Sequence, residues 1–444
     1  MLDLFINLLQ TPAIVLGLVA LVGLLLQKKK ANQVFTGTLK TVLGLLILSG
    51  GSGLIVNALA PFSELFADVF NLTGLVPFDE AVVGALQANV PIIARTSAII
   101  LAAGFFVNIV LARFTPLKYI FLTGHMMWIM SVVLAFVLHA SGYEETTIMV
   151  VGSILQGAFL TLLPAIAQPT MRRITGGNTI AYGHLTTIGV VSSAWIGRLL
   201  GDPKKDVEKI KLPESLSFFK DTASSVAIVM GIFYLGLAIV AGPERVAVYA
   251  GEQNFLVWGL LGALGFTAGI LVLLQGVRMF LGELVPSFKG IADKLVPGAI
   301  PALDCPAIFG FAPTALMIGF IFSIFGMTVG MIVSGLVFGI VPLISIIGGF
   351  FTGGAAGIMG NATGGPRGAM VAGFVYGLWL TVPVAATYEI FDLTQFGVTG
   401  TSLLVSDALV ALPLFKIPLV GIGVFVALYV WYSIRELKYK KENS

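Results

Sequence analysis

Long apolar windows separated by short polar segments dominate the pattern of this chain. A helix needs roughly 17–25 apolar residues to cross the hydrocarbon core of a bilayer. Windows of this kind lie near 11–27, 40–60, 92–112, 117–138, 146–166, 222–241, 255–275, 314–338, 368–387 and 417–434, with a shorter one at 340–352. The pattern predicts an all-α polytopic membrane protein with about eleven transmembrane helices, the last of them near the carboxyl end.

Two weaker segments, 178–200 and 295–312, are only mildly apolar and contain many small and polar residues. Irregular backbone at membrane depth is tolerated only where protein or a water-filled cavity covers it. We therefore predict re-entrant hairpins or broken helices in both segments. The run Gly50-Gly51-Ser52-Gly53 is too short for a phosphate-binding loop, and we predict a flexible break inside its span.

A short pattern occurs twice, about half a chain apart. Residues 38–53 align without gaps with residues 276–291, and downstream the segment ending at Asp79 resembles the segment ending at Asp304. Transporters are commonly built from two repeats, with the substrate site between them near mid-membrane. The duplication therefore predicts a carrier and relates Asp79 to Asp304.

The composition excludes several classes of protein. Hydrophobic residues make up 57% of the chain and charged residues only 11%, against about 25% charged residues in soluble domains. The net charge of +3, with basic residues at loop ends, favours membrane topology over nucleic-acid binding. A single cysteine, Cys305, permits no intrachain disulfide, and we expect no metal and no cofactor. No GxxxxGK[ST] motif is present, which argues against direct ATP drive.

The positions of lysine and arginine predict the orientation, because cytoplasmic loops carry an excess of both. Lys28–Lys30 follow the first span, which we expect to be retained, so the amino terminus is predicted to lie outside. The basic tail between Arg435 and Lys441 predicts a cytoplasmic carboxyl terminus, and hence an odd number of crossings. The lysine-rich loop at 201–221 is predicted to be cytoplasmic as well.

Ionisable residues inside apolar spans are rare because their burial is costly, so each is a candidate functional residue. Asp304 occupies a polar break, where its carboxylate can accept hydrogen bonds from sugar hydroxyls or take a hydroxyl proton as a general base. A helix N-cap is the alternative. His125 and His184 each follow a glycine and can hydrogen-bond a polyhydroxylated ligand or simply pack.

Three further polar or ionisable residues have structural interpretations. Arg278 and Glu283 are predicted to form an ion pair on one amphipathic helix. Cys305, beside Asp304, is predicted to be a buried packing residue rather than a nucleophile.

Several motifs occur in order between about residues 35 and 320. They are Gly37-Thr38-Leu39-Lys40-Thr41 with Gly51-Ser52-Gly53, Leu122-Thr123-Gly124-His125-Met126-Met127, Lys211-Leu212-Pro213, Gln275-Gly276-Val277-Arg278-Met279-Phe280, Leu295-Val296-Pro297-Gly298-Ala299, Leu303-Asp304-Cys305 and Phe311-Ala312-Pro313. Together they resemble the membrane subunit IIC of the ascorbate-type phosphotransferase system (PTS), in the ascorbate–galactitol group.

The resemblance implies a homodimeric translocator of ascorbate or a related sugar or polyol in the bacterial cytoplasmic membrane. It implies a single membrane-embedded IIC domain over 1–444 with inverted repeats, the first at about 10–241 and the second at about 255–390, and a last helix at about 417–434. A separate IIB protein, supplied by IIA, would phosphorylate the substrate, so no phosphorylated residue is expected on this chain.

The family's binding positions carry over to seven residues of this sequence: Gly51, Ser52, His125, His184 and Asp304, with Asp79 and Glu80 near a further contact region. Two positions depart from the ascorbate pattern, which has glutamine where this chain has Ile129 and Leu185. A pentitol or related sugar is therefore an alternative substrate. An ion- or proton-coupled secondary transporter, with Asp304 and a histidine as a proton relay, is the alternative function.

Overall fold

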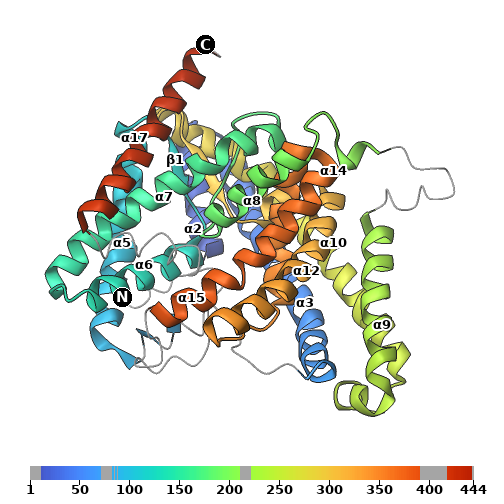
Figure 1. Cartoon of the computed structure of the whole chain (residues 1–444). Coiled ribbons are helices and arrows are strands. Elements are labelled where there is room, and N and C mark those ends of the chain that lie inside the picture. Colours follow the sequence, from blue (N-terminus) through green and yellow to red (C-terminus); the bar gives the residue numbers. More distant parts are fainter. Residues whose placement is uncertain are drawn as a thin grey trace.

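The structure is a computed structural model that describes residues 12–71, 83–210 apart from 85 and 88, 222–390 and 418–442 (Figure 1). Its helices are α2 (Pro12–Leu26), α3 (Ala31–Val69), α5 (Pro91–Phe114), α6 (Gly124–Ala140), α7 (Glu145–Thr175), α8 (Thr187–Leu200), α9 (Thr222–Ala250), α10 (Phe255–Lys294), α11 (Pro306–Phe309), α12 (Pro313–Phe338), α13 (Ile346–Gly348), α14 (Gly354–Trp379), α15 (Val382–Ile390) and α17 (Pro418–Glu442). The helical turns η1 (Val207–Lys209) and η3 (Gly349–Gly353) and the strands β1 (Tyr119–Phe121), β2 (Ala181–Tyr182) and β3 (Ile300–Leu303) complete the described elements.

Seven helical stretches in these described ranges are long and apolar enough to cross a membrane: Ala31–Val69, Pro91–Phe114, Glu145–Thr175, Val226–Ala250, Phe255–Ile291, Pro313–Phe338 and Ile346–Ala386. Shorter apolar helices occupy Leu16–Leu26, Gly124–Ala140 and Thr187–Leu200. The prediction of an all-α polytopic membrane protein is thus confirmed. The total of about eleven crossings and the division into inverted repeats stay predictions.

The structure differs from the apolar windows in two places. The window at 117–138 is not one helix, because β1 occupies its first residues and α6 begins only at Gly124. The windows at 340–352 and 368–387 belong to one helical stretch, Ile346–Ala386. The segments 178–200 and 295–312 do contain irregular backbone, as predicted, in the form of β2 followed by α8 and of β3 followed by α11.

The two long helices α3 and α10 pack against each other, and glycine makes their close approach possible. A Cβ atom on Gly44 or Gly51 of α3 would overlap the backbone of α10 at Phe280 or Leu273. The predicted break at 50–53 is wrong, because α3 continues through it as regular helix. Gly44 and Gly51 provide room for a neighbouring helix rather than flexibility, as small residues do in membrane helix contacts.

The segments 38–53 and 276–291, which share the repeated pattern, lie on these same two helices. One charged pair joins them, since Lys40 Nζ lies 3.3 Å from Glu283 Oε1. The predicted pairing of Glu283 with Arg278 is therefore replaced by a pairing between helices. Residues five apart on one helix do not share a face, and this spacing explains the difference.

The residues that follow α8 form a clasp, which we define as residues 201–210, against α12 and α14. The backbone N–H of Val207 donates to Asn361 Oδ1 at 2.9 Å, and the amide nitrogen of Asn361 donates to Asp206 at 2.8 Å. Glu208 accepts from the hydroxyl of Thr314 at 2.7 Å and from the backbone N–H of Ala315 at 2.8 Å. The clasp thereby ties the end of α8 to the first turn of α12 and to the middle of α14.

A short buried sheet lies between two hydrophobic cores. Successive side chains of a strand point to opposite faces. Tyr119 and Phe121 of β1 accordingly join the core around α5, α6 and α7, whereas Ile120 joins the core around α3, α9, α10, α12 and α14. In β2, Ala181 joins the core around α5, α6 and α7, and Tyr182 joins the other core. The sheet therefore connects the two cores.

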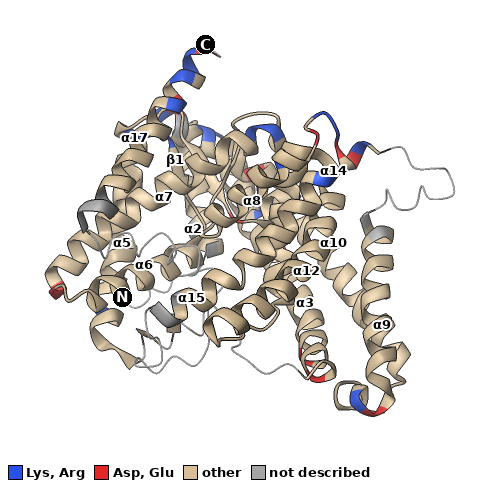
Figure 2. Cartoon of the chain, in the orientation of Figure 1, with Lys and Arg blue, Asp and Glu red and all other residues tan. Residues whose placement is uncertain are grey.

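The last helix, α17, packs beside α7 through a nearly buried ion pair. Arg172 Nη2 lies 2.6 and 2.9 Å from the two carboxylate oxygens of Glu436, and the side chain of Glu436 is 4% exposed. The guanidinium of Arg172 also lies 3.5 Å from the ring centroid of Tyr439. Lysines and arginines gather at this end of the molecule, around the end of α17 and the clasp (Figure 2).

Candidate substrate site

The three strands run parallel in the order β1-β3-β2, so their carboxyl ends meet at one edge. Phe121 pairs with Ala302 and Tyr182 pairs with Leu303. His125, His184 and Asp304 each follow one of these strands within four residues. Three residues that are far apart in sequence are thus brought to one place by strand pairing.

Amide side chains from neighbouring helices bond the outer edge of β1 and the residue before β2. Asn108 of α5 is fully buried, donates to the carbonyl of Tyr119 at 3.0 Å and accepts from the N–H of Phe121 at 3.1 Å. Gln168 of α7 donates to the carbonyl of Ile180 at 3.5 Å. Buried backbone groups need hydrogen-bond partners, and these two amides supply some of those that a three-stranded sheet lacks.

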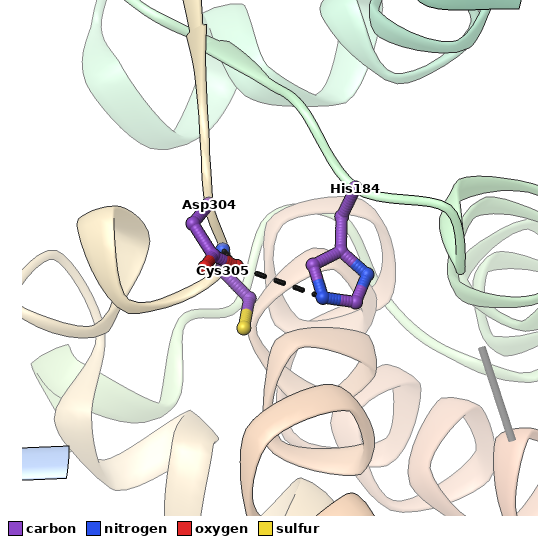
Figure 3. Close-up of side chains that lie close together, drawn as sticks. All are labelled: His184, Asp304 and Cys305. Atoms are coloured by element: carbon purple, nitrogen blue, oxygen red, sulfur yellow. Dashed lines mark hydrogen bonds and ion pairs between the residues drawn. The ribbon is translucent and has the colours of Figure 1, made fainter. Parts of the chain in front are cut away.

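Asp304 lies between the two histidines. Its Oδ1 is 3.6 Å from His184 Nε2, and its Oδ2 is 3.6 Å from His125 Nε2. Figure 3 shows the Asp304 carboxylate and the His184 ring close together, with Cys305 beside them. Oδ1 also accepts from the backbone N–H of Cys305 at 2.6 Å. The side chain of Asp304 therefore does not cap α11, whose N-cap is Cys305 without a side-chain capping bond, and its Oδ2 is directed toward His125.

The two histidines have different surroundings. The side chain of His184 is 4% exposed, and its Nδ1 accepts from the backbone N–H of Thr186 at 3.3 Å. An accepting Nδ1 assigns the proton of a neutral imidazole to Nε2, the nitrogen that faces Asp304. The side chain of His125, in the first turn of α6, is 42% exposed. The ring of His184 is therefore held in place, whereas the ring of His125 is accessible to a ligand.

This arrangement suits a ligand rich in hydroxyl groups. Separations of 3.6 Å exceed normal hydrogen-bond lengths, so a water or a ligand hydroxyl can bridge each carboxylate oxygen to its histidine. The carboxylate supplies acceptors and the histidines supply donors or acceptors. The side chain of Asp304 is 33% exposed, which leaves the carboxylate accessible.

The donor atoms of His184, Asp304 and Cys305 lie within 4.8 Å of one another. Cys305 is 2% exposed and belongs to the large core, as expected of a packing cysteine. The expectation that the site needs no metal stays a prediction.

The other candidate residues lie elsewhere. Gly51 and Ser52 are in α3, where Gly51 contacts α10, and no hydrogen bond or ion pair of the described residues joins either to Asp304. Asp79 and Glu80 lie outside the described residues. The structure therefore brings together three of the seven predicted positions.

Sequence reasoning missed the residues that support this site. Asn108 and Gln168 are amides within apolar spans, and polar residues at such positions commonly hydrogen-bond between helices. That signal was present in the sequence, but the sequence did not show that their partners are strand edges. Thr186, which fixes the His184 ring, carries no such signal.

The fold and the site together define a polytopic helical membrane protein of the transporter class. Residues 7–407 match the family of PTS system sugar-specific permease components (EIIC-GAT), and the chain belongs to this family. It is also similar to the "Ascorbate-specific PTS system EIIC component" of Mycoplasma pneumoniae (strain ATCC 29342 / M129 / Subtype 1), with 28% identity over 421 residues. That alignment covers 82% of this chain and 63% of the relative, so the chain spans less than two thirds of the relative's length.

Proposed function

We propose that this chain is the sugar-translocating EIIC subunit of a phosphoenolpyruvate-dependent PTS, and that it imports ascorbate or a related sugar or polyol. The observation that carries the proposal is the Asp304 carboxylate with a histidine Nε2 3.6 Å from each oxygen. Family membership over residues 7–407 supports the reaction class. Gly51, Ser52 and the Asp79–Glu80 region complete the proposed contacts with the substrate.

In this proposal Asp304 acts as both ligand and general base. A substrate hydroxyl attacks the phosphorus of a phosphocysteine on a separate IIB protein, which IIA has recharged. The O–P bond forms, the S–P bond breaks, the IIB thiolate leaves and Asp304 takes the hydroxyl proton. His184, whose ring is positioned by Thr186, orients the carboxylate, and His125 contacts the substrate from the open side.

The same proposal includes a homodimer in the bacterial cytoplasmic membrane, with the amino terminus outside and the carboxyl terminus inside. The gathering of lysine and arginine around the end of α17 and the clasp supports this orientation (Figure 2). The homodimer rests on the family resemblance alone.

Uptake of labelled ascorbate and pentitols tests the function, in cells that express this chain with and without IIA and IIB. We expect phosphorylated substrate inside the cells only when all three proteins are present. Free substrate inside cells that lack IIA and IIB would instead establish an ion- or proton-coupled secondary transporter, with Asp304 and a histidine as the proton relay.

Asp304→Asn tests the site. A hydrogen bond to a charged group contributes about 1.5–3 kcal/mol. We therefore expect substrate affinity to fall about tenfold or more, with loss of phosphorylation. Asp293→Asn, which changes an exposed aspartate at the end of α10, is the matched control and should transport normally. Normal binding and transport by Asp304→Asn would leave Asp304 with only its hydrogen bond to the backbone of Cys305.

The substrate class can be tested at Ile129 and Leu185. Both side chains are buried in the core around α5, α6 and α7, and neither can hydrogen-bond a hydroxyl. A site built to hydrogen-bond a ligand discriminates strongly against ligands that do not match it. The double variant Ile129→Gln, Leu185→Gln should shift the ratio of ascorbate to pentitol uptake toward ascorbate. An unchanged ratio in a correctly inserted double variant would show that these positions do not determine the substrate.

A further inference from the structure

A cavity of about 350 Å³ lies at the amino-terminal edge of the sheet, opposite the edge that carries the histidines. Lys118, Tyr119 and Ile300 line it from the starts of β1 and β3, and Asn178 lines it from the loop before β2. The helix α17 contributes Glu436 and Lys440, and Pro116, Gly298 and Ala299 complete the lining. The wall is therefore mostly apolar, and it carries two ammonium groups, those of Lys118 and Lys440.

The carboxylate that lines this cavity, that of Glu436, is paired with Arg172 rather than with either lysine. Both carboxylate oxygens of Glu436 are already bound to Arg172. Lys118 Nζ donates to the backbone carbonyl of Arg113 at 2.8 Å, and within the described ranges neither Lys118 nor Lys440 forms an ion pair. The pKa of Lys118 is lowered by partial burial and by the charges of Lys440 and Arg113. An anion placed between these cations would relieve their repulsion.

An apolar surface leads to this cavity along α17. Val430, Ile434 and Leu437 are 50%, 49% and 55% exposed, and their spacing of four and three residues places them in one stripe. Lys440 follows Leu437 by three residues, so it lies at the border of the stripe one turn further on. On the neighbouring helix α5, Phe114 is 79% exposed. The surface thus combines an exposed apolar face with a basic cavity at its end.

We propose that the cavity binds the phosphate group of an anionic phospholipid, whose acyl chains lie along the exposed stripe of α17. Lys118 and Lys440 supply the charge that a phosphate needs. Basic pockets between membrane helices on the cytoplasmic side bind anionic head groups in this way. The apolar stripe favours a lipid over a free phosphate, because only a lipid has acyl chains that can contact the stripe.

Retention of lipid by the purified full chain tests the proposal. The protein in detergent is titrated with phosphatidylglycerol or with phosphatidylcholine, and bound lipid is measured by native mass spectrometry. We expect preferential retention of phosphatidylglycerol. Because one lysine near an anionic lipid contributes about 1 kcal/mol, Lys118→Gln and Lys440→Gln should each weaken retention about fivefold, and their combination about 25-fold.

Two controls make the result specific. Lys438→Gln removes an exposed lysine of the same helix that does not line the cavity, and it should change retention less than about twofold. The double variant Lys118→Arg, Lys440→Arg keeps both charges and should retain the lipid. A misfolded protein would lose lipid in this variant as well as in the glutamine double variant, so the comparison separates loss of charge from loss of fold.

Three results would overturn the proposal. Equal losses in Lys438→Gln and the glutamine double variant would indicate diffuse attraction rather than a site. Displacement of phosphatidylglycerol by millimolar inorganic phosphate would assign the cavity to a soluble anion. Loss of IIB-dependent phosphorylation with unchanged lipid retention in the glutamine double variant would assign it to the partner protein.

Discussion

Asn108 takes the place of a fourth strand in a sheet that has only three. Its amide group offers β1 one acceptor and one donor at 3.0 to 3.1 Å, as the backbone of a neighbouring strand would. The same amide nitrogen donates to Thr161 at 3.2 Å, so α5, α7 and β1 meet at this side chain. Since β1 leads directly to His125, a buried amide on another helix helps to position a proposed substrate ligand.

Asn108→Leu should therefore destabilise the protein and weaken substrate binding. It leaves the N–H of Phe121 and the carbonyl of Tyr119 buried without a partner, and each such group costs about 1–3 kcal/mol. Thermal unfolding in detergent and substrate affinity measure the two effects. Thr161→Val removes the hydrogen bond between the helices and the bond of Thr161 to the carbonyl of Gly157 within α7, but it leaves the edge of β1 paired, so it should have a clearly smaller effect. Equal effects of the two variants would contradict the role of Asn108 at the strand edge.

At the scale of elements, the clasp holds the beginning of α12 through Glu208. The pKa of Glu208 is raised above its ordinary 4.5, chiefly by burial, and its hydrogen bonds to Ala315 and Thr314 oppose that shift. A carboxyl with a raised pKa in the folded state keeps its proton longer than in the unfolded state. The folded state therefore loses stability as the pH rises from about 4.5 through the raised pKa. Hydrogen bonds of Asp206 to Asn361 and to the backbone of Glu208 outweigh its burial and lower its pKa below 3.8, so its contribution changes only in more acidic solution.

Glu208→Gln should flatten this pH dependence. The melting temperature of the parent in detergent should fall relative to that of the variant as the pH rises above about 4.5, because glutamine does not titrate. Glu252→Gln, which changes an exposed glutamate of the turn after α9, should keep the slope of the parent. A variant that follows the parent at every pH would show that Glu208 does not titrate in this window.

The elements also show how far sequence reasoning reached. Length and apolarity identified the long helices, because a membrane span leaves a signal of many residues. The strand β1 has three residues inside an apolar window, and a short apolar strand cannot be told from a helix by hydropathy. The sequence predicts a break around Gly51. The close approach of α10 that this glycine permits depends on tertiary packing, which leaves no local signal in the sequence. The candidates His125, His184 and Asp304 came from the cost of buried charge and from a family resemblance, whereas Asn108 became visible only with its partners.

At the scale of the whole molecule, the uneven distribution of charge predicts topology. Lysine and arginine gather at the end that carries the clasp and the end of α17, and such an excess marks the cytoplasmic side (Figure 2). A reporter active only in the cytoplasm should work when fused after Ser444 and when inserted within 211–221. The same reporter fused before Met1 should be inactive. Activity at the amino-terminal fusion, or silence at either of the other two sites, would contradict the proposed orientation.

The strand order β1-β3-β2 has a consequence for how the protein is made. The central strand, Ile300–Leu303, is the last of the three to leave the ribosome, and β1 and β2 pair only with it. Until it arrives, Asn108 can pair with the outer edge of β1, while the inner edges of β1 and β2 lack their partner. A nascent chain that stops before residue 300 holds both histidines without their carboxylate. The sheet, and with it the meeting of both histidines with Asp304, is therefore completed only after the chain has been made beyond residue 304.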